Sequence, residues 1–220
     1  DRLGEDLKQF GFGAPTGIDL VGEGKGVLPS REWKRITQEK PWYPGETVIA
    51  GIGQGYWVVT PIQLASALAT LADGAVRIRP HLLLATQDGL NGARVPFGPP
   101  ATTASFVHDP ANLEAVRTGM ISVMHGPTGT ARAVGADSPY RIAGKSGTAQ
   151  RFRRKDGAEY DENRVSEHLR HQALFVAYAP AEAPTIAVAV VVEHGNSGSK
   201  AAAPVARRIL DAWLLRSPPQ

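Results

Sequence analysis

Two apolar runs near the C-terminal end constrain the fold of this chain most. Residues 173–179 and 185–193 are rich in valine and alanine, and Pro180 and Pro184 stand in the short connection between them. Such runs are typical of strands, and a connection this short favours an antiparallel hairpin. Residues 142–150 are a third strand candidate, so the sequence predicts a small antiparallel sheet.

Helices are predicted on both sides of these strands. The best-marked helix begins after Thr60, where Pro61 and Gln63 complete a capping box, and it ends at Gly74. Other helices are expected at residues 1–10, 30–38, 110–125 and 200–216, the last with Val205, Ile209, Ala212 and Trp213 on one face. Residues 76–84 are expected to be extended, and 89–100 irregular because of their glycine and proline content. The order predicts an α+β fold, an antiparallel sheet flanked by helices.

Composition excludes several classes of protein. The 220 residues carry 24 Lys and Arg against 21 Asp and Glu, a net charge of +3, which is too small a surplus to predict a nucleic-acid partner. Cysteine is absent, so neither disulfides nor thiolate metal sites are expected. The longest nearly apolar run, 186–192, is far shorter than the ~20 residues that span a bilayer. Because the chain opens on Asp1, we expect a processed product or an excerpt of a longer protein.

The segment from Gly144 to Ala149, Gly-Lys-Ser-Gly-Thr-Ala, carries the most chemical information. Lys145 supplies a positive charge and Ser146 a hydroxyl donor, and together they can hold a carboxylate. Gly147 lets a ligand approach the backbone closely, and the backbone N–H of Thr148 can face a developing oxyanion. We predict that this strand binds an anionic, extended substrate; an ordinary strand with an exposed lysine is the alternative.

Three other motifs have weaker claims to chemistry. A phosphate-binding loop needs a glycine five residues before Gly144, where Pro139 stands. The glycines between residues 51 and 55 follow no apolar strand and lack the spacing of a dinucleotide loop. Ser197 and Lys200 match the Ser-x-x-Lys pattern of serine acyl enzymes, but the glycines around Ser197 favour a loop before the last helix.

No metal ion or cofactor is expected. His168 and His171 have the spacing of a metal pair, but Arg170 lies between them and no third ligand is evident, so they are interpreted as solvated loop histidines. A basic run is followed by acidic residues that cancel it, which predicts a solvated hairpin tip. The two sets are Arg151, Arg153, Arg154, Lys155 and Asp156, Glu159, Asp161, Glu162.

Several motifs, taken in order, resemble the penicillin-binding transpeptidases. The stretch from Lys145 to Gln150 is similar to their third active-site motif. Further similar stretches are residues 10–13, 16–20, 42–47, 52–56, 60–65 and 173–180. The resemblance runs from the beginning of the chain to the final helix. It is greatest to the monofunctional (class B) members of the penicillin-binding protein 2 type of Gram-negative bacteria.

This resemblance implies a β-lactamase/transpeptidase-like fold and a D,D-transpeptidase. A serine attacks the D-Ala-D-Ala bond of a peptidoglycan stem peptide, D-Ala leaves, and an amine of a neighbouring stem attacks the acyl-enzyme to form a crosslink. β-Lactams stall the enzyme at the acyl stage. On this template Lys145 and Ser146 match the positions that bind the substrate carboxylate, with Lys145 also tuning the site electrostatically. Thr148 matches the backbone oxyanion donor, and the substrate is expected to add to Lys145–Thr148 as a β-strand.

The family also implies a location and partners. The parent protein is expected on the periplasmic side of the bacterial inner membrane, held by an N-terminal helix. Its expected partners are peptidoglycan stem peptides, β-lactam antibiotics, a membrane glycosyltransferase and other elongation-machinery proteins.

The chain departs from the family pattern at the nucleophile. No Ser-x-Asn or Ser-x-Asp occurs, and the Ser-x-x-Lys at Ser197 follows the third motif instead of preceding it. We therefore expect residues 1–220 to be the C-terminal part of a transpeptidase domain, inactive alone, without the nucleophile-bearing part. Its sheet should expose apolar surface and cause association. The alternatives are a non-catalytic binding or scaffold module, and a β-lactamase or D,D-carboxypeptidase of the same superfamily.

Overall fold

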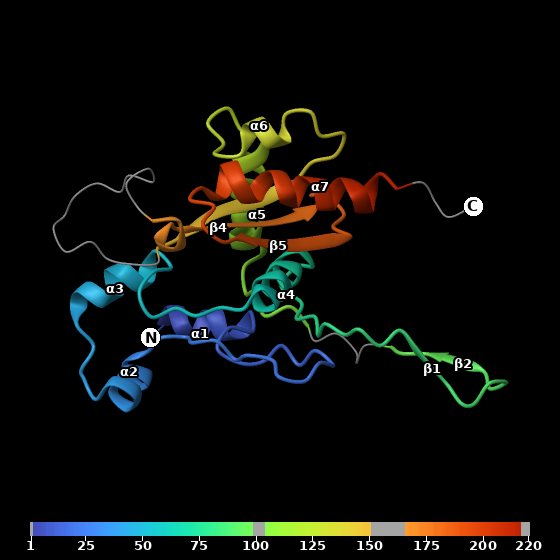
Figure 1. Ribbon diagram of the computed structural model, residues 1–220, viewed down its shortest axis with the longest axis horizontal. Helices are drawn as coiled ribbons and strands as arrows, with labels where there is room; N and C mark the ends of the chain where they lie inside the picture. The colour runs from blue at the N-terminus through green and yellow to red at the C-terminus, as the bar shows by residue number, and fades with distance from the viewer. Residues whose placement is uncertain (1, 99–103, 151–165, 217–220) are drawn as a thin grey trace. The chain divides into compact units, whose positions relative to one another are not determined.

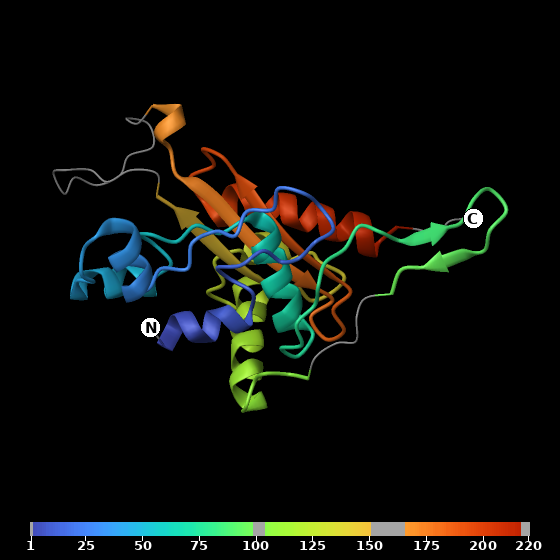
Figure 2. The ribbon, with the colours of Figure 1, turned by 90° about the horizontal axis from the view of Figure 1, so that it is seen from below.

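A computed structural model describes residues 2–98, 104–150 and 166–216, shown in two orientations in Figures 1 and 2. The chain divides into two compact units, Asp1–Val107 and His108–Gln220. That both units form the C-terminal part of one transpeptidase domain stays a prediction.

The first unit is mostly helical. Its elements are α1 (Arg2–Gln9), α2 (Arg31–Gln38), α3 (Pro44–Gly51), α4 (Pro61–Ala72), β1 (Ala85–Gln87) and β2 (Arg94–Pro96). The predicted helices at 1–10, 30–38 and after Thr60 are confirmed. Ser30 caps α2 by accepting the backbone N–H of Trp33 at 3.0 Å, and Thr60 forms the predicted capping box with Gln63 on α4. These local signals are short-range hydrogen bonds, which is why the sequence alone locates the helices.

One helix of this unit was not predicted, and one expectation is wrong. Pro44 begins the unpredicted helix α3, where Glu46 accepts the backbone N–H of Tyr43 at 2.7 Å. Residues 89–100 are not wholly irregular, because β2 pairs antiparallel with β1 and Pro96 stands at the strand end. Residues 76–84, which are expected to be extended, belong to no helix or strand. Pro44 thus marks the beginning of a helix, and Pro96 marks the end of an edge strand.

Polar side chains hold the glycine-rich loop between α1 and α2 in place. The amide of Gln63, on α4, donates to the carbonyl oxygens of Ala14 at 2.8 Å and Lys25 at 3.0 Å. The carboxylate of Asp19 accepts the backbone N–H groups of residues 82–83 at 2.6 and 2.8 Å, and these bonds lower the pKa of Asp19. The loop therefore has a defined path although few apolar side chains hold it.

A partly buried ion pair joins α2 to α3. Lys34 is 2% exposed, and its ammonium donates to both carboxylate oxygens of Glu46, at 2.5 and 2.7 Å. The Tyr56 hydroxyl donates to Glu46 at 3.0 Å, and the ring of Tyr43 lies 4.3 Å from the lysine nitrogen. The hydrogen bond from Lys34, followed by that from Tyr43, lowers the pKa of Glu46. The aromatic and acidic residues of stretches 42–47 and 52–56 thus have a structural role.

The second unit contains the predicted sheet. Its elements are α5 (Pro110–His125), α6 (Arg132–Gly135), β3 (Ala143–Ala149), η1 (Glu167–Leu169), β4 (Gln172–Ala179), β5 (Ile186–Val192), η2 (Gly198–Ala202) and α7 (Ala203–Leu214). The strands are antiparallel in the order β3-β4-β5, with Lys145 opposite Val176 and Ser146 opposite Phe175. The predicted hairpin, third strand, α5 and closing helix are confirmed, and so is the α+β layering. The predicted solvated tip at 151–162 lies outside the described residues.

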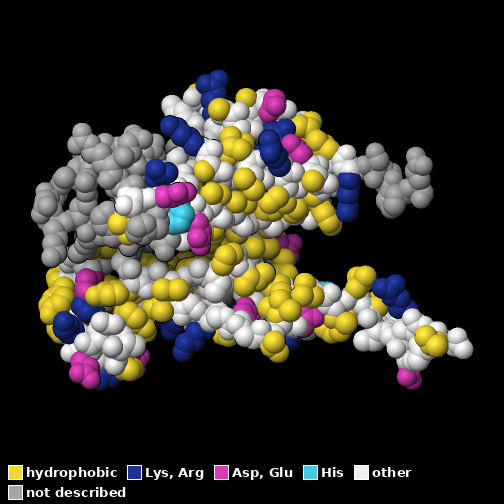
Figure 3. Space-filling model, viewed as in Figure 1, with side chains coloured by type: hydrophobic (Ala, Val, Ile, Leu, Met, Phe, Trp, Pro, Cys, Tyr) yellow, Lys and Arg dark blue, Asp and Glu magenta, His cyan; other side chains and the backbone are white. Residues whose placement is uncertain are grey.

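Helix α7 covers one face of this sheet (Figures 1 and 2). Small side chains allow a close approach, because Ala203 and Ala206 are buried against β4 together with Leu210. The apolar face named in the sequence is the exposed one. Val205, Ile209 and Trp213 are 42, 42 and 44% exposed, and Ala212 is also exposed. Hydrophobic side chains accordingly gather over α7 and β5 in Figure 3. Helix α7 has apolar side chains on both faces, so the periodicity of the sequence does not identify which face is buried.

Candidate active site

Strand β3 presents the predicted site residues at an edge of the sheet. Among the described residues β3 pairs on one side only, with β4. Gly144 is buried, whereas Lys145 and Thr148 are exposed and Ser146 and Gly147 are partly exposed. The structure therefore brings the predicted residues together on an accessible strand, as an edge-added substrate requires.

Side-chain alternation divides the site between the two faces of the sheet. Lys145 points to the face opposite that of Ser146 and Thr148, and its ammonium donates to the carbonyl oxygen of Ser146 at 2.6 Å. The Ser146 hydroxyl lies 3.5 Å from the Thr130 hydroxyl, and the Thr148 hydroxyl donates to the carbonyl oxygen of Asn196 at 3.4 Å. Cationic and hydroxyl donors thus lie within a few residues of one another on this edge.

The N-terminal end of η2 lies directly against the site strand. A Cβ atom at Gly198 would lie 2.5 Å from the carbonyl oxygen of Gly147 and 2.3 Å from that of Leu174. Only glycine allows this contact without displacement of the strand backbone. The expected loop at Ser197 is confirmed: Ser197 lies in the loop directly before the π-helical turn η2, and its hydroxyl lies 3.3 Å from that of Ser199.

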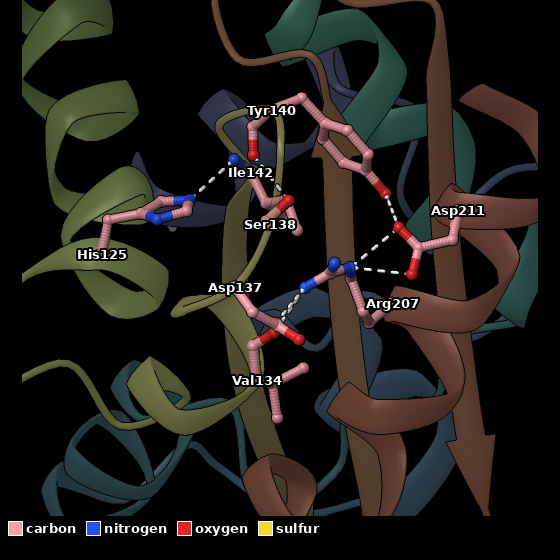
Figure 4. A network of polar contacts seen from close by, with 8 residues as sticks. All are labelled: His125, Val134, Asp137, Ser138, Tyr140, Ile142, Arg207 and Asp211. Atoms are coloured by element: carbon pink, nitrogen blue, oxygen red, sulfur yellow. Dashed lines mark hydrogen bonds and ion pairs between the residues drawn. The ribbon is translucent and has the colours of Figure 1, made fainter. Parts of the chain in front are cut away.

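A polar network fixes the segment that leads into β3 (Figure 4). Arg207 on α7 donates through Nε to both carboxylate oxygens of Asp211, at 2.8 and 2.9 Å, and through a terminal nitrogen to the Val134 carbonyl at 2.9 Å and Asp137 at 3.0 Å. The Tyr140 hydroxyl donates to Asp211 at 2.5 Å. Burial opposes ionisation of Asp211, but the bonds from Arg207 and Tyr140 outweigh it and lower its pKa. Burial, followed by the hydrogen bond to Asp211, raises the pKa of Tyr140, whereas Arg207 acts in the opposite direction.

The histidine expectation needs a correction. His171 is 8% exposed and therefore buried, not solvated, and burial lowers its pKa. The side chain of His168 lies outside the described part of the chain. No group of at least three His, Cys, Asp or Glu side chains suited to a metal ion occurs among the described residues. Within the same residues, no helix has the length and hydropathy needed to cross a membrane.

Sequence reasoning missed Thr130 and Gly198 as neighbours of the site. Thr130 follows α5 and Gly198 follows β5, so both reach β3 only through the tertiary fold. The one local signal was the glycine content of the turns that carry them.

The comparisons with known proteins agree with this architecture. The family model of the penicillin binding protein transpeptidase domain matches residues 1–211. The peptidoglycan D,D-transpeptidase MrdA of Escherichia coli strain K12 is 43% identical over 217 residues, which cover 98% of this chain and 34% of that protein. The chain thus spans about a third of the length of this curated relative.

Solved structures give the same result. Pseudomonas aeruginosa PBP2, in complex with WCK 5153, has a TM-score of 0.82 at 51% identity, over 99% of this chain and 44% of that one. Helicobacter pylori PBP2, in complex with MreC, has a TM-score of 0.79 at 27% identity, over 97% of this chain and 36% of that one. The predicted likeness to the penicillin-binding protein 2 type and the predicted transpeptidase-like fold are both confirmed. On its family match and its similarity to MrdA, the chain belongs to the penicillin binding protein transpeptidase domain family.

Proposed function

We propose that the protein containing this chain is a peptidoglycan D,D-transpeptidase that β-lactams acylate, and that β3 forms one wall of its active site. The observation that carries the proposal is the accessible pair Lys145 and Ser146 on the outer strand of the described sheet. Family membership and the similarity to MrdA, a peptidoglycan D,D-transpeptidase, support the same reaction.

In this proposal each residue of β3 has a distinct task. The Ser146 hydroxyl binds the terminal carboxylate of the stem peptide, and the flexible Lys145 side chain, which leaves the strand on the other face, reaches around the open edge of β3 to bind the same group. Charge-assisted hydrogen bonds of this kind are about twice as strong as neutral ones. The substrate backbone lies along the outer edge of the strand, beside Gly147. The N–H of Thr148 donates to the oxyanion that forms when a serine, supplied by another part of the protein, attacks the substrate carbonyl.

The reaction is acyl transfer without a cofactor or a metal ion. The serine oxygen forms an ester with the penultimate D-Ala carbonyl, and the terminal D-Ala leaves as the free amino acid. An amine from a second stem peptide attacks this ester, which forms the crosslink and returns the serine. A β-lactam carries a carboxylate and a reactive amide, so it enters the same site and remains as an acyl-enzyme.

The remaining expectations belong to the whole protein. Residues 1–220 are its C-terminal part, which lacks the nucleophile-bearing part of the domain. The protein acts on the periplasmic side of the inner membrane. Its partners include an MreC-like protein, because the similar Helicobacter pylori PBP2 was solved with MreC, together with a membrane glycosyltransferase.

Labelling with a fluorescent penicillin tests this function. We expect the full-length protein to be labelled and the isolated chain not to be labelled. Replacement Lys145→Ala should lower the acylation rate by at least about tenfold, the value of one charge-assisted hydrogen bond. Lys40→Ala, which removes an exposed lysine from the first unit, is the matched control and should leave the rate unchanged.

Each alternative has its own outcome. Labelling of the isolated chain at Ser197 would overturn the assignment of the nucleophile. A folded full-length protein that is never labelled would favour the binding or scaffold module. Release of D-Ala without crosslinking would favour a carboxypeptidase, and rapid turnover of the penicillin would favour a β-lactamase.

A further inference from the structure

The turn between α5 and α6 holds Thr130 in a fixed place. A Cβ atom at Gly129 would lie 2.4 Å from the Ser122 carbonyl oxygen and 2.5 Å from that of Val123. On the other side of Thr130, the Ala131 N–H donates to the Val123 carbonyl at 3.0 Å, and the Ala131 side chain is 2% exposed. Both neighbours of Thr130 are therefore packed on the C-terminal turns of α5, so its backbone has little freedom.

The Thr130 side chain is exposed and faces the site strand. Its hydroxyl oxygen lies 3.5 Å from the hydroxyl oxygen of Ser146. Ser146 and Thr148 share one face of β3, but the Thr148 hydroxyl donates to the Asn196 carbonyl. The hydroxyl of Ser146 has the Thr130 hydroxyl as its side-chain partner.

When an anion binds to Ser146, the chemistry of a hydroxyl decides which member of the Thr130–Ser146 pair donates the hydrogen bond. A hydroxyl donates one hydrogen bond and accepts others, whereas a carboxylate only accepts. If Ser146 donates to a carboxylate, its oxygen is left as the acceptor for the Thr130 hydroxyl. Donors arranged in series polarise one another, so the outer hydroxyl strengthens the bond made by the inner one.

We propose that Thr130 is a positioning residue for recognition of the substrate carboxylate: it donates to Ser146, which donates to the ligand. This inference rests on the proposed function and deepens it, because it makes the preference for a free carboxylate depend on a residue outside the Lys-Ser-Gly strand. Lys145 supplies the charge, and the Thr130–Ser146 pair supplies the orientation.

The experiment measures acylation of the full-length protein by a fluorescent penicillin and by its carboxyl methyl ester. Thr130→Val removes the hydroxyl and keeps the shape of the side chain. We expect it to lower the acylation rate for the free acid by about three- to tenfold, the usual range for one hydrogen bond. The rate for the ester should stay within about twofold, because an ester carries no charge for the relay to stabilise. Thr130→Ser should restore the rate, and Thr128→Val, on the same turn, is the matched control.

Double substitution tests the relay itself. In a Ser146→Ala background, Thr130→Val should cause no further loss, because the intermediate hydroxyl is already absent. Equal losses for acid and ester, full additivity with Ser146→Ala, or an unchanged Thr130→Val rate would each overturn the inference. A wild-type protein that is not acylated would instead refute the proposed function. If Thr130→Val does not fold, Thr130→Ser serves as the test. Because it keeps the hydroxyl, it should still be acylated faster by the free acid than by the ester, and loss of that difference would overturn the inference.

Discussion

The Nε2 atom of His125, on the last turn of α5, accepts the backbone N–H of Ile142 at 2.9 Å, immediately before β3 begins. The bond requires an unprotonated ring nitrogen. Burial, reinforced by the charge of Arg141, lowers the pKa of His125; Arg207 acts in the same direction and Glu182 opposes it. The entrance to the site strand is thus held by a histidine that must stay neutral.

This relationship predicts a pH-dependent stability. Because the folded-state pKa of His125 lies below its unfolded value of about 6.5, its contribution is complete above that pH. The contribution is lost as the pH falls from about 6.5 through the folded-state pKa. His171 adds to the same window, since burial lowers its pKa too.

The check is thermal unfolding of wild type and His125→Gln between about pH 7.5 and about pH 5.5. Glutamine keeps an acceptor in place of Nε2 but does not titrate. The wild type should lose more stability than the variant on acidification. Identical pH profiles would show that His125 does not titrate with folding.

Because η2 contacts β3 at Gly198, one methyl group added there should lower the stability of the protein strongly. Gly198→Ala places a Cβ atom 2.5 Å from the Gly147 carbonyl oxygen, so the strand or the turn must move. We expect a loss of about 1–3 kcal/mol in the free energy of unfolding, the usual cost of overpacking. Acylation of the full-length protein should slow as well, since the moved strand carries Lys145.

Gly119→Ala is the matched control, because a Cβ atom there meets nothing within 4 Å and the residue lies inside α5. It should be neutral or stabilising by up to about 1 kcal/mol, from helix propensity. Denaturant unfolding curves give both values. Equal effects at the two positions would contradict the assigned contact.

The network at Arg207 predicts a graded series of losses. Asp211→Asn removes the charge that Arg207 and Tyr140 both contact, and we expect it to cost about 1–3 kcal/mol of unfolding free energy. Tyr140→Phe should cost less, about 1 kcal/mol, because one hydrogen bond is lost. Glu182→Gln breaks an exposed ion pair with Arg141 and should cost under about 0.5 kcal/mol. Urea unfolding of the three variants orders them, and the reverse order would contradict the network.

The outer strand β5 predicts association of the isolated chain. Its residues are Ile-Ala-Val-Ala-Val-Val-Val, and among the described residues it pairs only with β4. An apolar strand open on one side is a template for pairing with another chain. Light scattering after size exclusion should give a mass above 23.4 kDa.

Val191→Lys, at a position that is 37% exposed, should shift the chain toward the monomer, because charge on an edge strand opposes pairing. Val205→Lys, on the exposed face of α7, is the control for charge alone. A wild-type chain that elutes as a monodisperse monomer would refute the prediction.

The parts of the fold that depend on neighbouring residues were predictable from the sequence. The α4 cap at Thr60 and the apolar alternation of β4 and β5 act over a few positions. Helix α3 and strand β2 were missed because their prolines also suit a chain without regular structure. The apolar residues named for the closing helix lie on its exposed face, because Ala203, Ala206 and Leu210 fit against the sheet instead.

The candidate site, like the fold, was predictable only where its residues are neighbours in the sequence. Lys145, Ser146, Gly147 and Thr148 are consecutive, so one strand locates them all. Thr130 and Gly198 come from separate turns, and no local pattern indicates that they meet β3. Only the folded structure brings the Thr130 hydroxyl near that of Ser146, and only there does the missing Cβ atom of Gly198 let η2 approach β3.

The pairing of β3 with β4 determines on which face of the sheet each site side chain lies. A one-residue slip would exchange Lys145 and Ser146 between the faces of the sheet, so the alignment must be exact. That alignment is set by the buried alternation of Ala173, Phe175 and Ala177, not by a tight turn. The faces on which Lys145 and Ser146 lie therefore depend on the packing of the strands themselves, and a substitution that disturbs the buried side chains of β4 acts on the site strand at a distance.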